Sequence, residues 1–228
     1  MLPEGNKFVV TACLVGLVCL QTAHASRHIR PSDPSSQAFQ RISFFANYTN
    51  RSDIEDETVS EIVAATANGQ TLIYTDGEQD AIGFVDIRDP RMPVADGIVE
   101  LGGEPTSVAV FGNSLALVGV NTSESLTNPS GNLTVVDIAT RTILAELDLG
   151  GQPDSVAISP NRRYVAIAIE NERDEDIIVD GVEGGLPQLP AGYLAIVDIR
   201  GADPSRWRVR QADLTGLSSY APEDPEPE

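Results

Sequence analysis

Three near-copies of one strand ending constrain the fold of this chain more than any other feature. Val-Asp-Ile occurs at residues 85–87, 136–138 and 197–199, each time after an apolar stretch, with the aspartates 51 and 61 residues apart. A second marker, Gly-Gly-Glu-Pro-Thr-Ser-Val at residues 102–108, recurs 48 residues later as Gly-Gly-Gln-Pro-Asp-Ser-Val. Residues 157–167 also align with residues 64–74. Repetition at such an interval indicates copies of one structural unit.

Each unit reads as four short strands that are rich in β-branched residues and separated by Gly, Asn and Pro. In the middle unit the expected strands are residues 107–111, 115–120, 133–138 and 143–149. Four-stranded units of about 40–50 residues predict an all-β fold, a β-propeller of four-stranded blades. A β-sandwich is the alternative. Within the first unit, Asn68-Gly69 predicts a type I′ hairpin turn.

The repeat gives about three blades, from residue 61 to residue 214. Closed propellers have about 4–8 blades. Residues 222–228 resemble the lead-in to a further inner strand. We therefore expect an incomplete ring, from a truncated chain or from one that a partner completes.

The N-terminus has the pattern of a secretory signal. Lys7 precedes an apolar run at residues 8–20, and Ala23-His24-Ala25 follows it. The run is shorter than the roughly 20 residues of a membrane span. We expect a signal peptide at residues 1–25 cleaved after Ala25, a flexible lead-in at 26–41 and a partial propeller at 42–228, in a secreted or periplasmic protein. A lipidated Cys13 is the alternative.

The residues that remain after this signal exclude much chemistry. Both cysteines and the only lysine lie within residues 1–25, and His28 is the only histidine beyond them. Thiol nucleophiles, Zn–Cys sites, catalytic lysines and most histidine chemistry are therefore excluded. The formal net charge of −19 argues against nucleic acid and against anionic membrane surfaces as partners.

Carboxylates are the functional groups that remain in number, and strand alternation places many of them together. In a propeller blade, the connection to the next blade and the connection between the second and third strands lie on the same face. Such acids suit a hard cation such as Ca²⁺, which binds six to eight oxygens. A solvated acidic rim is the alternative. The candidate metal ligands are Glu104, Asp154, Glu170, Glu172 and Asp174.

Two further side chains on this face are candidates for substrate binding. Asn121 and Arg173 could position a substrate, although pairing with neighbouring acids is the favoured interpretation of Arg173. We expect Trp207, the only tryptophan, to pack on its blade, and the aspartates of Val-Asp-Ile to serve as hydrogen-bond acceptors in turns. No catalytic residue is identified.

Several segments together resemble a known group of exported proteins. They are residues 103–110, 120–125, 128–131, 150–156, 168–176, 186–192 and 221–228. The sequence resembles the N-terminal propeller part of bacterial proteins described as "esterase-like activity of phytase", and the related choice-of-anchor and alkaline-phosphatase-like propellers. The resemblance implies a secreted or periplasmic propeller, metal-dependent and acting on phosphate esters. In such proteins the phytase-like half lies downstream of the part matched here.

Two functions from different classes follow. The first is a module for Ca²⁺-dependent phosphoester hydrolysis, acting on a small-molecule phosphate ester. The alternative is a non-catalytic propeller that binds a protein or a surface polymer, with calcium at most structural. A glycosidase with paired carboxylates is a third option.

Overall fold

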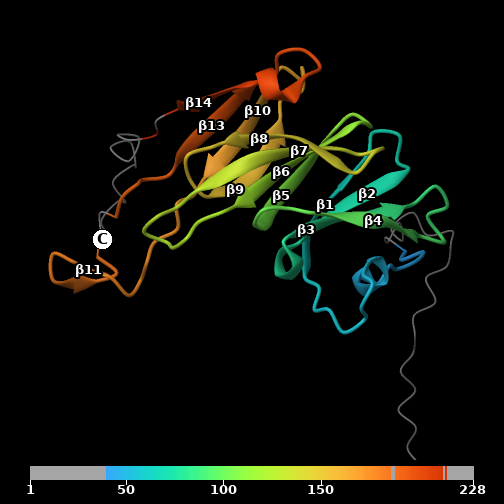
Figure 1. Cartoon of the computed structure of the whole chain (residues 1–228), viewed down its shortest axis with the longest axis horizontal. Coiled ribbons are helices and arrows are strands. Elements are labelled where there is room, and N and C mark those ends of the chain that lie inside the picture. Colours follow the sequence, from blue (N-terminus) through green and yellow to red (C-terminus); the bar gives the residue numbers. More distant parts are fainter. Residues whose placement is uncertain (1–39, 186–187, 213, 215–228) are drawn as a thin grey trace, which may run out of the picture. The chain divides into compact units, whose positions relative to one another are not determined.

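The chain folds into stacked antiparallel sheets, shown in Figure 1 as a computed structural model. The structure describes residues 40–185, 188–212 and 214, and its elements lie in one compact unit, Arg41–Glu228. The expectation of a signal peptide falls outside these residues. In the part described, no helix is long and apolar enough to cross a membrane.

In the described residues, all strands except one short pair lie in three four-stranded sheets, as the repeat predicts. The first sheet contains β1 (Ser60–Ala65), β2 (Thr71–Asp76), β3 (Ala81–Asp86) and β4 (Val94–Glu100). The middle sheet contains β5 (Glu104–Phe111), β6 (Leu115–Asn121), β7 (Gly131–Asp137) and β8 (Thr142–Asp148). The third sheet contains β9 (Pro153–Ile158), β10 (Tyr164–Ile169), β13 (Tyr193–Asp198) and β14 (Arg208–Ala212).

The remaining elements are short. They are the 3₁₀ helices η2 (Asn47–Asn50), η3 (Gly77–Gln79) and η4 (Pro204–Arg206), and the strand pair β11 (Ile178–Val179) and β12 (Val182–Glu183). Strands within each large sheet follow chain order, and the sheets are open. The innermost strand β5 contacts β1, β2 and β9. The arrangement is that of an incomplete propeller, which confirms the predicted fold class.

Each Val-Asp-Ile plays the same structural part in its sheet. Its isoleucine amide donates to the carbonyl just before the second strand, from Ile87 to Gln70 (2.9 Å), Ile138 to Ser114 (2.8 Å) and Ile199 to Arg163 (3.0 Å). Asp86 and Asp137 accept hydrogen bonds from the Arg88 and Thr140 amides in the turns that follow, as predicted. Asp198 instead accepts from the Arg210 side chain of β14. Hydrogen bonds from the backbone and side chain of Thr140 hold the pKa of Asp137 below its usual value.

The hairpin at Asn68-Gly69 differs from the predicted turn. A type I′ turn needs two central residues with positive φ, but only Gly69 adopts it here, with φ of 66°. Its amide donates to Thr66 O at 2.8 Å, and the Asn68 side chain accepts from the Gln70 amide at 3.1 Å. The type I′ prediction is therefore wrong, because the Asn68 side chain caps a longer loop. Arg162, with φ of 57°, occupies the matching position in the third sheet.

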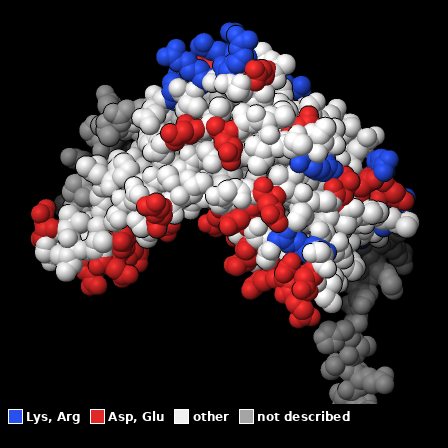
Figure 2. All heavy atoms as spheres, in the orientation of Figure 1, with Lys and Arg blue, Asp and Glu red and all other residues white. Residues whose placement is uncertain are grey.

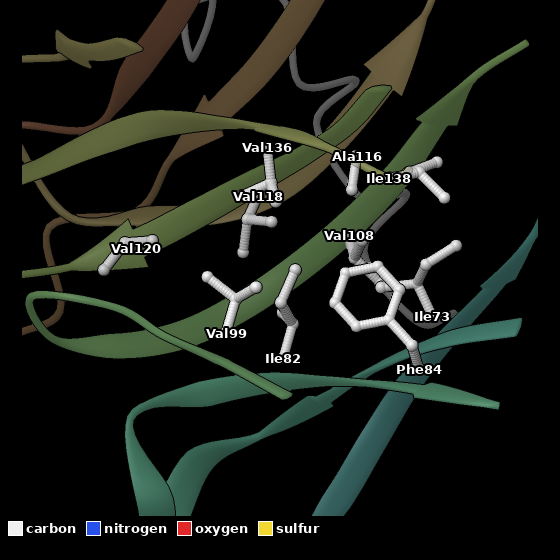
Figure 3. Close-up of a cluster of buried hydrophobic side chains, with 10 residues drawn as sticks. All are labelled: Ile73, Ile82, Phe84, Val99, Val108, Ala116, Val118, Val120, Val136 and Ile138. Atoms are coloured by element: carbon white, nitrogen blue, oxygen red, sulfur yellow. The ribbon is translucent and has the colours of Figure 1, made fainter. Parts of the chain in front are cut away.

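Strands β6 and β7 of the middle sheet are buried on both faces because a sheet covers each side, whereas the outer strand β8 is largely exposed. Ala116, Val118 and Val120 of β6 pack toward the first sheet, while Leu117 packs toward the third. Figure 3 shows the first of these interfaces, where Ile82 and Phe84 meet side chains of β5 and β6. Strands buried on both faces read as continuous apolar runs.

Aromatic side chains also join neighbouring sheets. Trp207 is 6% exposed, packs in the core between the middle and third sheets, and donates from Nε1 to Gly201 O at 3.2 Å. Its predicted packing role is confirmed. Arg141, from the turn after β7, lies with Cζ 3.9 Å from the centroid of the Phe84 ring and pairs with Asp96 of the first sheet.

The residues before β1 pack on the outer face of the first sheet. The Asn50 side chain donates to Tyr74 Oη (3.1 Å) and to Phe84 O (2.9 Å), and accepts from the Gly97 amide (3.1 Å). This cover buries Tyr74, and burial raises the pKa of its phenol above the usual 10.0.

Candidate functional site

Loops that alternation predicts on one face of the sheets do meet in the structure. In the first sheet, the Leu101 amide after β4 donates to Asp80 O before β3, at 2.7 Å. In the middle sheet, the Leu149 amide after β8 makes the equivalent bond to Gly131 O at 3.0 Å. We call this set of loops the acidic end, defined as residues 77–80, 101–103, 122–130, 149–152, 170–185 and 188–192.

A pocket of about 570 Å³ at the acidic end is formed mainly by the loop after β10. Four of the predicted site residues line it, namely Glu170, Glu172, Arg173 and Asp174. The rest of the lining is Leu126, Asn171, Glu175 and Asp176. The structure thus gathers five carboxylates and one guanidinium around one hollow.

Asn171 fixes the start of this loop. Its side chain is 8% exposed, and its backbone adopts a left-handed conformation with φ of 49°. Oδ1 accepts from the Gln152 amide at 3.0 Å, and Nδ2 donates to Ala191 O at 3.1 Å. The Gln152 side chain in turn accepts from the Glu172 amide at 3.1 Å. Asn171 therefore connects the lead-in to β9 with both ends of the loop.

Gln188 holds the middle of the same loop. Its Oε1 accepts from the Asp174 amide, and its Nε2 donates to Asp174 O, both at 2.9 Å. A second donation reaches Gly185 O at 3.2 Å. The strand pair β11 and β12 lies between these anchors, and Figure 1 shows β11 away from the third sheet. The backbone beneath the carboxylates is therefore positioned from within the loop.

In the second copy of the Gly-Gly marker, Gly150-Gly151, the backbone passes close to these anchors. Gly150 has φ of 75°, which favours glycine. A Cβ on Gly151 would lie 2.5 Å from Asn171 Oδ1. Tyr193 packs over the same turn and donates from Oη to Leu149 O at 2.5 Å, and burial raises the pKa of its phenol.

Glu104 belongs to a different hollow. It lines a pocket of about 320 Å³ between the first and middle sheets, together with Glu61, Glu78 and Asp80. A smaller pocket of about 160 Å³ shares Leu126, Asn171 and Glu172 with the 570 Å³ pocket. The predicted carboxylates are thus divided between separate hollows.

The other two predicted residues line none of these pockets. Asp154 is exposed on β9. Asn121 ends β6, and its Oδ1 accepts from the Ser123 amide at 3.0 Å. Within residues 40–185, 188–212 and 214, no group of three or more His, Cys, Asp or Glu side chains is placed to hold a metal ion. Calcium binding and the substrate roles of Asn121 and Arg173 stay predictions.

The comparisons with known proteins now give the family. The model of the choice-of-anchor I domain matches residues 61–223, a range that contains every predicted site residue. The chain belongs to the choice-of-anchor I domain family. No curated protein matches it in sequence.

One solved structure that the chain matches is hydrazine synthase from Kuenenia stuttgartiensis. The TM-score is 0.44 and the sequence identity 17%, over 67% of this chain and 37% of that chain. This choice-of-anchor I domain thus spans little more than a third of that chain, and so distant a likeness carries no information about function.

Sequence reasoning missed three residues that shape the site of this choice-of-anchor I domain. Gln152 and Gln188 hold the loop through amide hydrogen bonds, and Leu126 supplies an apolar wall from the middle sheet. Gln152 lies in the repeated marker at the place of Glu104, so the comparison of repeats could have singled it out. Gln188 and Leu126 lie in non-repeated loops and carry no such signal.

Proposed function

We propose that this choice-of-anchor I domain is part of an exported protein and binds a cationic ligand at its acidic end, with Ca²⁺ as the simplest such ligand. The observation that carries the proposal is the 570 Å³ pocket formed by residues 170–176 and Leu126. Choice-of-anchor domains are found on secreted or cell-surface proteins, which supports export.

The chemistry of the pocket fits a hard cation. Carboxylate oxygens are the ligands that Ca²⁺ prefers, and Glu170, Glu172 and Asp174 supply them from one short segment. The Asn171 and Gln188 hydrogen bonds fix the backbone, while Glu170 and Glu172 are exposed and have several rotamers available. Binding would therefore need side-chain rotation toward the ion without a change of fold.

Calorimetric titration with CaCl₂ tests this proposal. The pocket variant Glu170→Gln/Glu172→Gln should lose at least about tenfold in affinity, equivalent to about 1.4 kcal/mol. The control Glu55→Gln/Glu146→Gln removes the same charge from exposed positions elsewhere and should bind like the wild type. Equal binding by pocket variant and wild type would place the ion at another site. Absence of binding by the wild type would reject Ca²⁺ as the ligand.

A second candidate function is Ca²⁺-dependent phosphoester hydrolysis. Arg173 lines the same pocket as the carboxylates, and a guanidinium pairs well with phosphate oxygens. The resemblance to esterase-like phytase proteins points the same way. The bound ion would supply polarisation of the phosphate and an activated water, while Arg173 and Asn121 would orient the ester.

Phosphate release from p-nitrophenyl phosphate, with and without CaCl₂, separates the two functions. Hydrolysis predicts Ca²⁺-dependent release that falls in Arg173→Gln, whereas the binding module predicts Ca²⁺ binding without release. Glu104 and three other acids line a second oxygen-rich pocket. A lower Ca²⁺ affinity in Glu104→Gln would assign part of the binding to that pocket. Asp154 also stays a proposed Ca²⁺ ligand, and Asp154→Asn tests it in the same way.

Export through residues 1–25 is part of the proposal. Sequencing the N-terminus of the exported product should give Ser26 as the first residue. A lipidated Cys13 would show instead that the chain is attached to a membrane.

A further inference from the structure

The charge of this domain is polarised along its strands. The acidic end holds ten Asp and Glu residues and one arginine. The loops at the opposite ends of the strands are residues 66–70, 87–93, 112–114, 138–141, 159–163 and 199–207, and they hold seven arginines and two aspartates. We call this second set of loops the arginine end. In Figure 2, Lys and Arg gather at the top and most Asp and Glu lie lower down.

The densest part of the arginine end belongs to the third sheet. Arg162 and Arg163 lie in the turn between β9 and β10, and Arg200 and Arg206 lie between β13 and β14. The hydrogen bond from the Ile199 amide to Arg163 O, 3.0 Å, brings the two connections together. All four arginines are exposed. The arrangement therefore presents a compact positive surface on a chain whose net charge is −19.

Few acids neutralise this surface. Asp198 lies 3.7 Å from Arg200 and 3.4 Å from Arg210. Among the residues that the structure describes, no carboxylate lies within ion-pair distance of Arg162, Arg163 or Arg206. Arg162 instead lies over the Phe111 ring of the middle sheet, 5.8 Å from its centroid. Three guanidinium groups at this edge therefore keep their hydrogen-bond donors for an external partner.

We propose that the arginine end docks onto the acidic end of a second copy of this chain, in a head-to-tail contact. The inference rests on the proposed function, because it names the cationic partner of the acidic loops. Each copy carries both complementary surfaces at opposite ends of its strands, so one contact leaves a free arginine end and a free acidic end. Contacts of this heterologous kind propagate into chains unless the rotation between copies closes a ring.

The dependence of self-association on ionic strength follows from two charges, the net charge of the whole molecule and the opposite charges of the two facing sets of loops. Whole molecules of the same sign repel one another at long range, and this repulsion is strongest in dilute salt. At about 0.15 M ionic strength the Debye length is about 8 Å, so only the facing loops interact. Concentrated salt screens these pairs as well. Association should therefore be strongest at intermediate ionic strength and weaker on both sides of it.

Sedimentation velocity over a range of protein concentrations tests the proposal with two variants of the chain. The arginine-end variant is Arg162→Gln/Arg163→Gln/Arg206→Gln, and the acidic-end variant is Glu170→Gln/Glu172→Gln/Glu175→Gln. Each alone should sediment as a monomer, whereas the wild type should sediment faster as its concentration rises. An equal mixture of the two variants should form a heterodimer that does not elongate, because each variant retains one intact surface.

Two controls separate docking from misfolding. Arg162→Lys/Arg163→Lys/Arg206→Lys keeps the charge and should retain association, and Glu55→Gln/Glu100→Gln/Glu146→Gln should associate at least as well as the wild type. The arginine-end variant should still bind Ca²⁺ like the wild type, so failure of association is distinguishable from failure of the proposed function. A wild type that is monomeric at every ionic strength would overturn the inference, as would self-association of the arginine-end variant. Retention of the monomeric wild type on heparin through these arginines would overturn it in favour of a polyanionic partner.

Discussion

Replacement of Asn171 is the sharpest test of how the pocket loop is held. Asn171→Ala removes the hydrogen bonds to Gln152 and Ala191, at about 1 kcal/mol each. It also places a Cβ-bearing residue with no compensating side chain at φ of 49°, which adds about 1 kcal/mol. The expected loss of stability is therefore about 3 kcal/mol. Asn171→Gly loses the same two bonds without the conformational strain, so it should cost about 2 kcal/mol.

Urea unfolding followed by the fluorescence of Trp207 measures both variants, because this side chain is the only tryptophan and is buried in the core of the third sheet. Asn171→Asp is the electrostatic comparison: it keeps the acceptor for the Gln152 amide but places a carboxylate oxygen against Ala191 O, in a pocket that five other carboxylates line. Its cost should therefore be at least that of the glycine variant. A glycine variant less stable than the alanine variant would refute the conformational argument. Losses below about 0.5 kcal/mol in both would refute the hydrogen-bond argument.

The other predictions concern the contacts between sheets and the buried phenol. Arg141→Met removes the guanidinium that covers the buried Phe84 ring and pairs with Asp96. Urea unfolding should show that the free energy of unfolding falls by about 1–2 kcal/mol. Asp96→Asn, which removes only the ion pair, should cost about 0.5 kcal/mol. Tyr74 has a raised pKa, so its contribution to stability is complete below pH 10, near its unfolded value, and is lost as pH rises through the folded pKa. Wild-type stability should accordingly fall more steeply above pH 10 than that of Tyr74→Phe, and parallel curves would contradict this. Gly131→Ala puts a Cβ within 2.3 Å of the third sheet and should cost about 1–3 kcal/mol or prevent folding, whereas Gly69→Ala meets no atom within 4 Å and costs only its left-handed φ, about 1 kcal/mol.

The three sheets could be predicted from the sequence because each repeated motif corresponds to a local contact that recurs in the structure. Val-Asp-Ile marks the end of a third strand through the same amide hydrogen bond in each sheet. The second glycine of each Gly-Gly marker lies where a Cβ would be crowded, by Asn121 O at Gly103 and by Asn171 Oδ1 at Gly151. Strand alternation then assigned the loops to their ends. These features recur in every unit where the geometry recurs, so one sequence contains several independent copies of the signal.

The details that failed are those decided by single side chains or by non-repeated loops. The turn at Asn68-Gly69 follows from an asparagine side chain that caps the loop, which the dipeptide alone does not reveal. The placement of β11 and β12, and the hydrogen bonds of Gln188, belong to a loop that occurs once. The predicted carboxylates share one end, but which of them share a hollow depends on loop paths that alternation does not specify.

The charge polarity could have been obtained from the sequence. Once the four-strand unit is known, each loop is assigned to one end, and summing its charges gives the acidic and arginine ends directly. The structure adds the contact between Ile199 and Arg163, which brings two arginine-bearing connections side by side.

Hydrogen–deuterium exchange with and without CaCl₂ tests most directly whether the loop after β10 forms a cation site. Slower exchange is expected in peptides covering residues 170–176 and the facing residues 122–130, because a bound ion would restrict the pocket lining. The pocket variant Glu170→Gln/Glu172→Gln should lose this protection. Unchanged exchange in both segments, or protection confined to other parts of the chain, would contradict the assignment.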